Sequence, residues 1–109
     1  TGCGNILNLP LPPDSGSKQF REAWSSLGFP ALRAFAPDLL VISAGFDAHE
    51  SDPLAQLRLQ VEDYSWITRE ICDYAASACG GRVVSVLEGG YNLDALASCV
   101  RAHVEALVA

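Results

Sequence analysis

The chain has 109 residues, of which 50% are hydrophobic and 18% are charged, and its formal net charge at pH 7 is −6. This composition supports one folded domain with an apolar core and excludes an intrinsically disordered chain. Its 7 Lys and Arg residues are spread along the sequence and form no basic stretch, so we expect no direct contact with nucleic acid. The apolar stretches are too short to cross a membrane and no secretory signal is visible. We therefore expect a cytoplasmic protein, or a nuclear one if it is eukaryotic.

The first strand and helix are predicted in the first third of the chain. Residues 5–9 alternate polar and apolar side chains and are followed by prolines, which predicts a short strand. Residues 17–35 repeat apolar side chains at helical spacing, which predicts a helix. Gly28 and Pro30 interrupt this segment, so we expect a break or kink before the apolar stripe resumes.

Two further strands and two further helices follow. Residues 38–44 and 82–87 are largely apolar runs, a pattern typical of strands covered on both faces. Residues 62–78 and 93–108 carry apolar stripes of helical period, and Asn92 is the expected N-cap of the last helix. Three strands alternating with three helices predict an α/β fold with a parallel sheet, right-handed crossovers and flanking helices.

The predicted sheet is incomplete. A sheet of three strands leaves apolar edges unprotected, so we expect residues 1–109 to form one part of a larger sheet. The sequence contains no Met and begins with Thr1, which favours a processed chain or a part of a longer protein. The open edges would favour self-association or association with the missing part of the domain.

The four cysteines form no metal-binding pattern. They contain no CxxC pair, and no histidine lies at a zinc-finger spacing from Cys3, Cys72, Cys79 or Cys99. The last three lie on helical faces among apolar neighbours. This pattern predicts small residues in or near the core of a protein from a reducing compartment.

Groups able to do chemistry follow the second and third predicted strands. In open parallel sheets, ligands bind beyond the carboxyl ends of the strands. Asp47 follows residues 38–44, and Tyr91 follows residues 82–87 after a pair of glycines. Asp47 could bind a metal, act as a base or cap a helix, and the Tyr91 hydroxyl could donate a hydrogen bond to an oxyanion. On the pattern alone, a turn aspartate and a packing tyrosine are the commoner outcome.

The two histidines add little to a metal site. Asp47 and His49 form an Asp-x-His pair whose side chains would point to one side of an extended chain. A catalytic zinc needs three protein ligands, however, and His103 lies deep in the last predicted helix. We expect His103 to be a surface or half-buried residue on a helix flank. The absence of a Rossmann glycine motif, a Walker lysine and a GxSxG elbow argues against nucleotide binding and against a hydrolase triad.

Two blocks of the sequence resemble a known family. The segments PDLLVISAGFDAHESDPLAQLRL, at 37–59, and GRVVSVLEGGYNLDALA, at 81–97, resemble the carboxyl-terminal part of zinc-dependent histone deacetylases. Class II enzymes, bacterial deacetylase-like amidohydrolases and acetylpolyamine amidohydrolases are the most similar. The segment GNILNLPLP, at 4–12, is similar to a strand that precedes these blocks in that family. The resemblance implies an arginase/deacetylase-like fold and zinc-dependent hydrolysis of an acetylated lysine or acetylated amine.

The resemblance also implies roles for individual residues. Asp47 matches an aspartate ligand of the catalytic zinc. Tyr91 matches the tyrosine whose hydroxyl polarises the scissile carbonyl and stabilises the oxyanion. Gly89 matches a glycine beside the acyl-lysine channel, and Leu54 matches an apolar residue that lines it. Asp52 matches the aspartate of a shared Asp-Pro-Leu turn, as a structural residue.

Several features of the family are missing from this chain. His49 matches no ligand, and the other two zinc ligands and the tandem histidines that handle the proton of the attacking water are expected upstream of Thr1. Because one carboxylate cannot hold a catalytic zinc, we expect the parent protein to be active and this chain alone to be inactive. Gln60 and Val61 replace a common Thr-Pro pair, which weakens the expected helix cap. The alternative is a non-catalytic truncated or split half; an arginase-like chemistry is disfavoured by the Tyr91 motif.

Overall fold

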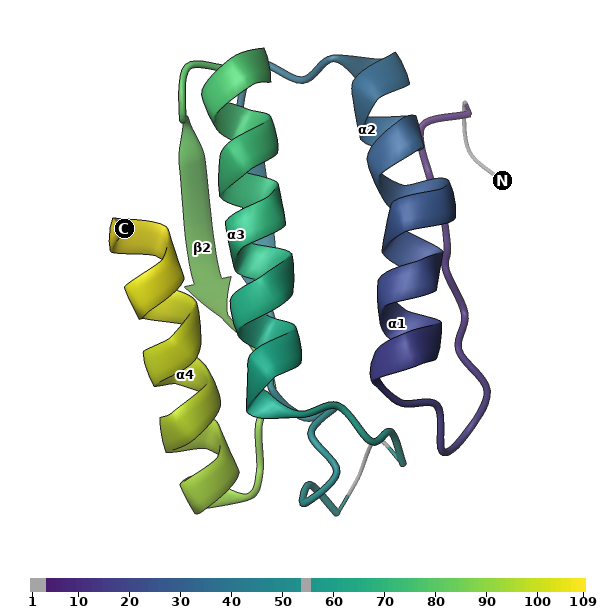
Figure 1. Cartoon of the computed structure of the whole chain (residues 1–109), viewed down its shortest axis with the longest axis vertical. Helices are drawn as coiled ribbons and strands as arrows, with labels where there is room; N and C mark the ends of the chain where they lie inside the picture. Colours follow the sequence, from purple (N-terminus) through teal and green to yellow (C-terminus); the bar gives the residue numbers. More distant parts are fainter. Residues whose placement is uncertain (1–3, 54–55) are drawn as a thin grey trace.

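The computed structural model describes residues 4–53 and 56–109, and two parallel strands lie at the centre of this part (Figure 1). β1 spans Leu40–Ala44 and β2 spans Val83–Leu87. Leu40 lies opposite Val83 and Ala44 lies opposite Leu87. Both strands fall within predicted segments, so the expected parallel pairing of 38–44 with 82–87 is confirmed.

Two long helices pack together on one side of the sheet (Figure 1). α3 (Val61–Ala78) forms the crossover from β1 to β2, and α4 (Leu93–Val108) follows β2. Asn92 caps α4 as expected, because its Oδ1 accepts a hydrogen bond of 2.9 Å from the N–H of Ala95. Among the described residues, no helix is both long enough and apolar enough to cross a membrane.

The first predicted helix is continuous but changes type in the middle. α1 (Ser17–Ala23) leads into a π-helical turn, η1 (Trp24–Gly28), and then into α2 (Phe29–Phe35). A Cβ on Gly28 would lie 2.4 Å from the ring of Trp24, so this turn requires glycine. Pro30 follows directly on this widened turn, and it has no N–H to donate to a carbonyl of the preceding turn. The expected interruption is therefore a local widening and not an end of the helix.

The predicted strand at residues 5–9 is wrong. These residues form no strand and run alongside α1 and α2 (Figure 1). Leu7 and Leu9 line a pocket there together with Trp24. A strand requires a partner that completes its hydrogen bonds, and neither β1 nor β2 pairs with this segment. The alternation of side chains indicated an extended backbone but could not indicate a partner.

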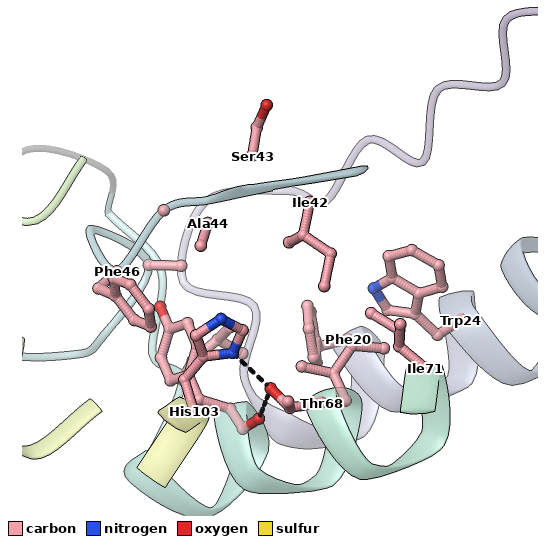
Figure 2. A pocket seen from close by; sticks show the side chains of 14 residues that line it. Phe20, Trp24, Ile42, Ser43, Ala44, Phe46, Thr68, Ile71 and His103 are labelled. Carbon is pink, nitrogen blue, oxygen red and sulfur yellow. Dashed lines mark hydrogen bonds between the residues drawn. The ribbon is translucent and has the colours of Figure 1, made fainter. Parts of the chain in front are cut away.

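Only one face of the sheet is covered within the described part of the chain. Ile42 and Ala44 point toward the helices, and Ser43 points away from them (Figure 2). On the uncovered side lie three valines, which we name the open valine face, with exposed fractions of 64%, 49% and 51% for Val41, Val84 and Val86. The expectation of strands covered on both faces is therefore not met by this chain's own residues.

The core lies between the sheet and its helices. Phe46, Leu59 and Tyr64 form a buried cluster with Ala44 and Cys99. Cys79 is also buried and Cys72 is half-buried, and all three described cysteines are free thiols. Burial raises the pKa of Cys99 to about 11, so its thiol stays protonated. The prediction of cysteines in or near the core is confirmed for these three, and Cys3 lies outside the described residues.

A buried carboxylate joins α1 to the start of α3. Asp63 is fully buried, and it accepts hydrogen bonds from the N–H of Gln60 at 2.8 Å and from the hydroxyl of Ser17. Its other oxygen lies 2.9 Å from Nε of Arg21. Burial opposes the charge, but the hydrogen bonds from Gln60, Ser17 and Arg21 outweigh it and hold the pKa of Asp63 below its usual range. The helix start that the sequence predicts to be weak is thus supported by Asp63.

Candidate functional site

The segments that follow β1 and β2 remain paired beyond the ends of the strands. The N–H of Glu88 donates to the carbonyl of Ala44 at 2.9 Å, and the N–H of Phe46 donates to the carbonyl of Gly89 at 2.8 Å. Because the strands are parallel, both segments leave the sheet at the same edge. This pairing brings Asp47, the residue after Phe46, next to Gly89.

The Asp47 carboxylate lies against the backbone of Gly89. A Cβ on Gly89 would lie 3.0 Å from Oδ2 of Asp47, and a Cβ on Gly45 would lie 3.2 Å from Oδ1. The half-buried carboxylate therefore occupies space that a side chain at either position would need. Glycine at both positions permits this close approach of the carboxylate to the main chain, and a Cβ at either would force the carboxylate to shift. Two of the predicted site residues are thus in contact.

Tyr91 follows a second glycine, whose backbone has a positive φ. Gly90 has φ of +142°, and a Cβ there would lie 2.7 Å from Leu96 Cδ1 and 3.3 Å from Phe46 Cβ. Gly90 therefore lies close to Phe46, at the edge where Asp47 lies. The side chain of Tyr91 itself is 56% exposed. Within the described part of the chain it is thus accessible from solvent.

The loop after β1 is closed on itself by backbone hydrogen bonds. The N–H of Leu59 donates to the carbonyl of Ala48 at 3.0 Å, and the N–H of Glu50 donates to the carbonyl of Leu59 at 3.0 Å. Leu59 is 1% exposed, so it anchors this closure in the core. Leu54, the predicted channel residue, belongs to this loop but lies outside the described residues.

Asp52 connects this loop to the segment that carries Tyr91. One oxygen, Oδ2, accepts hydrogen bonds from the N–H groups of Tyr91 at 2.7 Å and Asn92 at 3.3 Å. The side-chain amide of Asn92 in turn donates to the backbone carbonyl of Ser51 at 3.2 Å. The sequence predicts a structural Asp52 but does not indicate this partner. The only available signal was the position of both residues after neighbouring strands.

The described residues do not form a complete metal site. His49 Nδ1 accepts a hydrogen bond from the N–H of Ser51 at 3.0 Å, within its own turn. No group of three or more His, Cys, Asp or Glu side chains in residues 4–53 and 56–109 is placed to hold a metal ion. Asp47 fits a zinc site as one carboxylate ligand, and this part of the chain supplies too few donors for the whole site.

His103 is buried, so the expectation of a surface or half-buried residue is wrong. Its exposed fraction is 8%. Its Nδ1 lies 2.8 Å from Oγ1 of Thr68 on α3 (Figure 2). Its Nε2 lies 2.8 Å from Oγ of Ser85 on β2. The sheet-facing side of α4 can bury an imidazole because two hydroxyls from other elements satisfy both ring nitrogens.

The hydroxyl of Thr68 determines which ring nitrogen carries the proton. It donates to the carbonyl of Tyr64 at 2.7 Å, so its oxygen can only accept from Nδ1–H of His103. In the neutral ring Nε2 is then the acceptor, and Ser85 donates to it. Burial lowers the pKa of His103, which favours this neutral form. The residue therefore joins α3, α4 and β2 and is not a candidate ligand.

A cavity lies on the core side of β1. Its volume is about 180 Å³, and its walls are largely apolar, including Phe20, Trp24 and Ile71 (Figure 2). Asp47 and Tyr91 do not line it. The candidate site is therefore the sheet edge at Asp47 and Gly89 and not this cavity.

Comparisons with known proteins agree with the two motifs. A model of the family described as "Histone deacetylase domain" matches residues 1–107. The chain is 44% identical over 108 residues to "Type-2 histone deacetylase 2" of Dictyostelium discoideum, an alignment that covers 96% of this chain and 6% of that protein.

Two solved structures share the fold of the chain. The "HDA15 HD domain" matches with a TM-score of 0.85 at 35% identity, over 94% of this chain and 28% of that one. The "acetylpolyamine aminohydrolase from Burkholderia pseudomallei" matches with a TM-score of 0.81 at 32% identity, again over 94% and 28%. The chain thus spans only a minor part of the proteins it matches. By sequence and by fold, it belongs to the histone deacetylase family.

Proposed function

We propose that residues 1–109 are the carboxyl-terminal portion of a catalytic domain that hydrolyses an acetyl-amide with zinc. Family membership supports the reaction class, and the name of the similar aminohydrolase supports an acetylated amine as one possible substrate beside acetylated lysine. The observation that carries the proposal is the contact of the Asp47 carboxylate with Gly89, because it unites the two strand-end motifs.

Asp47 serves as one zinc ligand in this proposal. Its carboxylate is half-buried and lies close to Gly45 and Gly89. Zinc, when bound, would supply a Lewis acid for the acetyl carbonyl and for the attacking water. The other ligands come from residues outside this chain, since a catalytic zinc needs three protein ligands.

Tyr91 stabilises the oxyanion in this proposal. Its hydroxyl donates a hydrogen bond to the acetyl oxygen as negative charge develops there. The exposed side chain follows directly on Gly89 and Gly90, at the edge where Asp47 lies. Gly89 and Leu54 would border the channel that admits the acetylated chain. Glycine at position 89 leaves room for a substrate as well as for the Asp47 side chain.

Assays of the intact protein and of the isolated chain test this function. The intact protein is expected to contain one zinc per site and to release acetate from an acetyl-lysine peptide or an acetylpolyamine. The 109-residue chain alone is expected to do neither, because it offers one ligand. Tight zinc binding together with turnover by the isolated chain would contradict the proposal. A cytoplasmic or nuclear location stays a prediction.

A second candidate function is a non-catalytic half that associates with a partner. The open valine face, Val41, Val84 and Val86, favours it, since apolar strands exposed on one face tend to be covered. Sedimentation velocity of the isolated chain tests this alternative. Reversible association that increases with concentration is expected, whereas a monomer at all concentrations would argue against it.

A further inference from the structure

We propose that Asp52 is a positioning residue for catalysis: its carboxylate fixes the backbone of Tyr91 and thereby the place of the Tyr91 hydroxyl. The inference rests on the proposed function of Tyr91. It assigns to Asp52 a specific task that a residue serving only the Asp-Pro-Leu turn would not have.

The contact is short and comes from a buried charge. Oδ2 of Asp52 lies 2.7 Å from the N–H of Tyr91 and 3.3 Å from the N–H of Asn92. Asp52 is only 7% exposed, so water competes little for this oxygen. Hydrogen bonds to an ionised carboxylate are stronger than those between neutral groups. The tether is thus strong enough to restrain the backbone at Tyr91.

The tether also satisfies donors that α4 leaves without helical partners. The first N–H groups of a helix and those just before it have no carbonyl within the helix to accept them. Asn92 accepts from Ala95, inside the helix, and Asp52 accepts from Tyr91 and Asn92, just outside it. A carboxylate at this end also complements the positive end of the helix dipole.

Tyr91 depends on such a restraint because little else holds it. Within the described residues its side chain is 56% exposed, so packing by this chain contributes little to its position. The two residues before it are Gly89 and Gly90, which have the most conformational freedom of any residue type. The hydrogen bond from Phe46 to Gly89 fixes one side of this segment. Asp52 fixes the other side.

The loop that presents Asp52 is itself restrained. The N–H of Asp52 donates to the carbonyl of His49 at 2.9 Å, and Leu59 closes the loop from within the core. Asp47 begins the same loop. The spacing between the proposed zinc ligand and the proposed oxyanion donor is therefore set through one closed loop and one carboxylate.

Kinetics of the intact protein test the inference with Asp52→Ala, Asp52→Asn and the control Asp94→Asn, which removes an exposed charge from the first turn of α4. Asp52→Ala is expected to lower kcat by roughly tenfold or more, as misplacement of a catalytic group does, with KM and zinc content unchanged. Asp52→Asn keeps an oxygen that can accept these hydrogen bonds, so this variant should retain most of the wild-type kcat. Asp94→Asn should match wild type.

A second variant separates positioning from general destabilisation. In a Tyr91→Phe background, Asp52→Ala should lower kcat little further, because its effect acts through the Tyr91 hydroxyl. An equal loss of kcat with and without that hydroxyl would overturn the inference, as would wild-type kcat for Asp52→Ala.

Hydrogen exchange gives a readout that does not need activity. Asp52→Ala should speed exchange of the Tyr91 amide by roughly tenfold or more in the intact protein, since its acceptor is lost. Unchanged exchange would overturn the tether. An inactive wild-type protein with the expected exchange would contradict the proposed function while leaving the tether itself established.

Discussion

The carboxylate of Asp47 lies so close to Gly89 that a Cβ at position 89 would be 3.0 Å from Oδ2, which is tighter than an ordinary contact. The two residues come from motifs that are far apart in the sequence. The parallel pairing that continues past β1 and β2 brings them together. The contact therefore makes the two motifs one site.

The first prediction concerns this contact. Gly89→Ala should displace the Asp47 carboxylate and weaken zinc binding by the intact protein about tenfold or more, a loss typical of disturbed ligand support. Gly16→Ala is the matched control, because a Cβ there would meet only an ordinary contact at 3.5 Å from the carbonyl of Arg58. Competition with a zinc chelator measures both affinities. Equal affinities in the two variants would contradict the account.

The second prediction concerns the buried carboxylate of α3. Asp63→Asn should lower the free energy of unfolding at pH 7 by about 2 kcal/mol, since it removes charge-assisted hydrogen bonds to Ser17 and Arg21. Folding lowers the pKa of Asp63 from its ordinary value of 3.8. The stability that the charged carboxylate contributes is therefore present above pH 3.8, and it is lost as the pH falls through the pKa of the folded state. Urea unfolding from pH 7 to pH 2 measures the difference.

The control for that prediction is Glu62→Gln, which neutralises the exposed neighbouring acid in the same helical turn. It should change stability by less than about 0.5 kcal/mol, as surface substitutions usually do. A comparable loss in both variants would show that charge at the start of α3, and not the buried network, is responsible.

The third prediction concerns His103. Because burial lowers its pKa in the folded chain, the unfolded chain binds more protons below the ordinary value of 6.5. Stability should therefore decline as the pH falls below 6.5, until the folded pKa is reached. His103→Gln should remove this part of the pH dependence. An identical slope in wild type and variant between pH 7 and pH 5, measured by urea unfolding, would be incompatible with it.

The fourth prediction concerns the open valine face. Val84→Lys places a charge at its centre and should weaken self-association of the isolated chain. Val104→Lys is the control, since this residue is similarly exposed, by 46%, but lies on α4. Sedimentation velocity compares the two. If both variants associate as wild type does, another surface mediates the contact.

The sequence predicts the parts of this fold that depend on local pattern. Apolar runs and helical stripes indicate β1, β2, α3 and α4, and Asn92 shows its capping role by its position before α4. Residues 5–9 are the counterexample. Their alternation is that of a strand, but a strand also needs a neighbour, which no local pattern reveals.

Contacts between distant residues could not be predicted in the same way. His103 is buried because Thr68 and Ser85 happen to face it from two other elements. The contact of Asp52 with Tyr91 likewise depends on how the loop after β1 closes. The strand-end rule indicates the edge at which such contacts form, and side-chain geometry decides which residues make them.

The central claim assigns different tasks to Asp47 and Tyr91, so zinc content and kcat measured together on variants of the intact protein test it most directly. Asp47→Ala should lose both zinc and activity. Tyr91→Phe should keep its zinc and lose about 100- to 1,000-fold in kcat, as the removal of one oxyanion donor does. Full zinc content in Asp47→Ala, or wild-type kcat in Tyr91→Phe, would contradict the assignment.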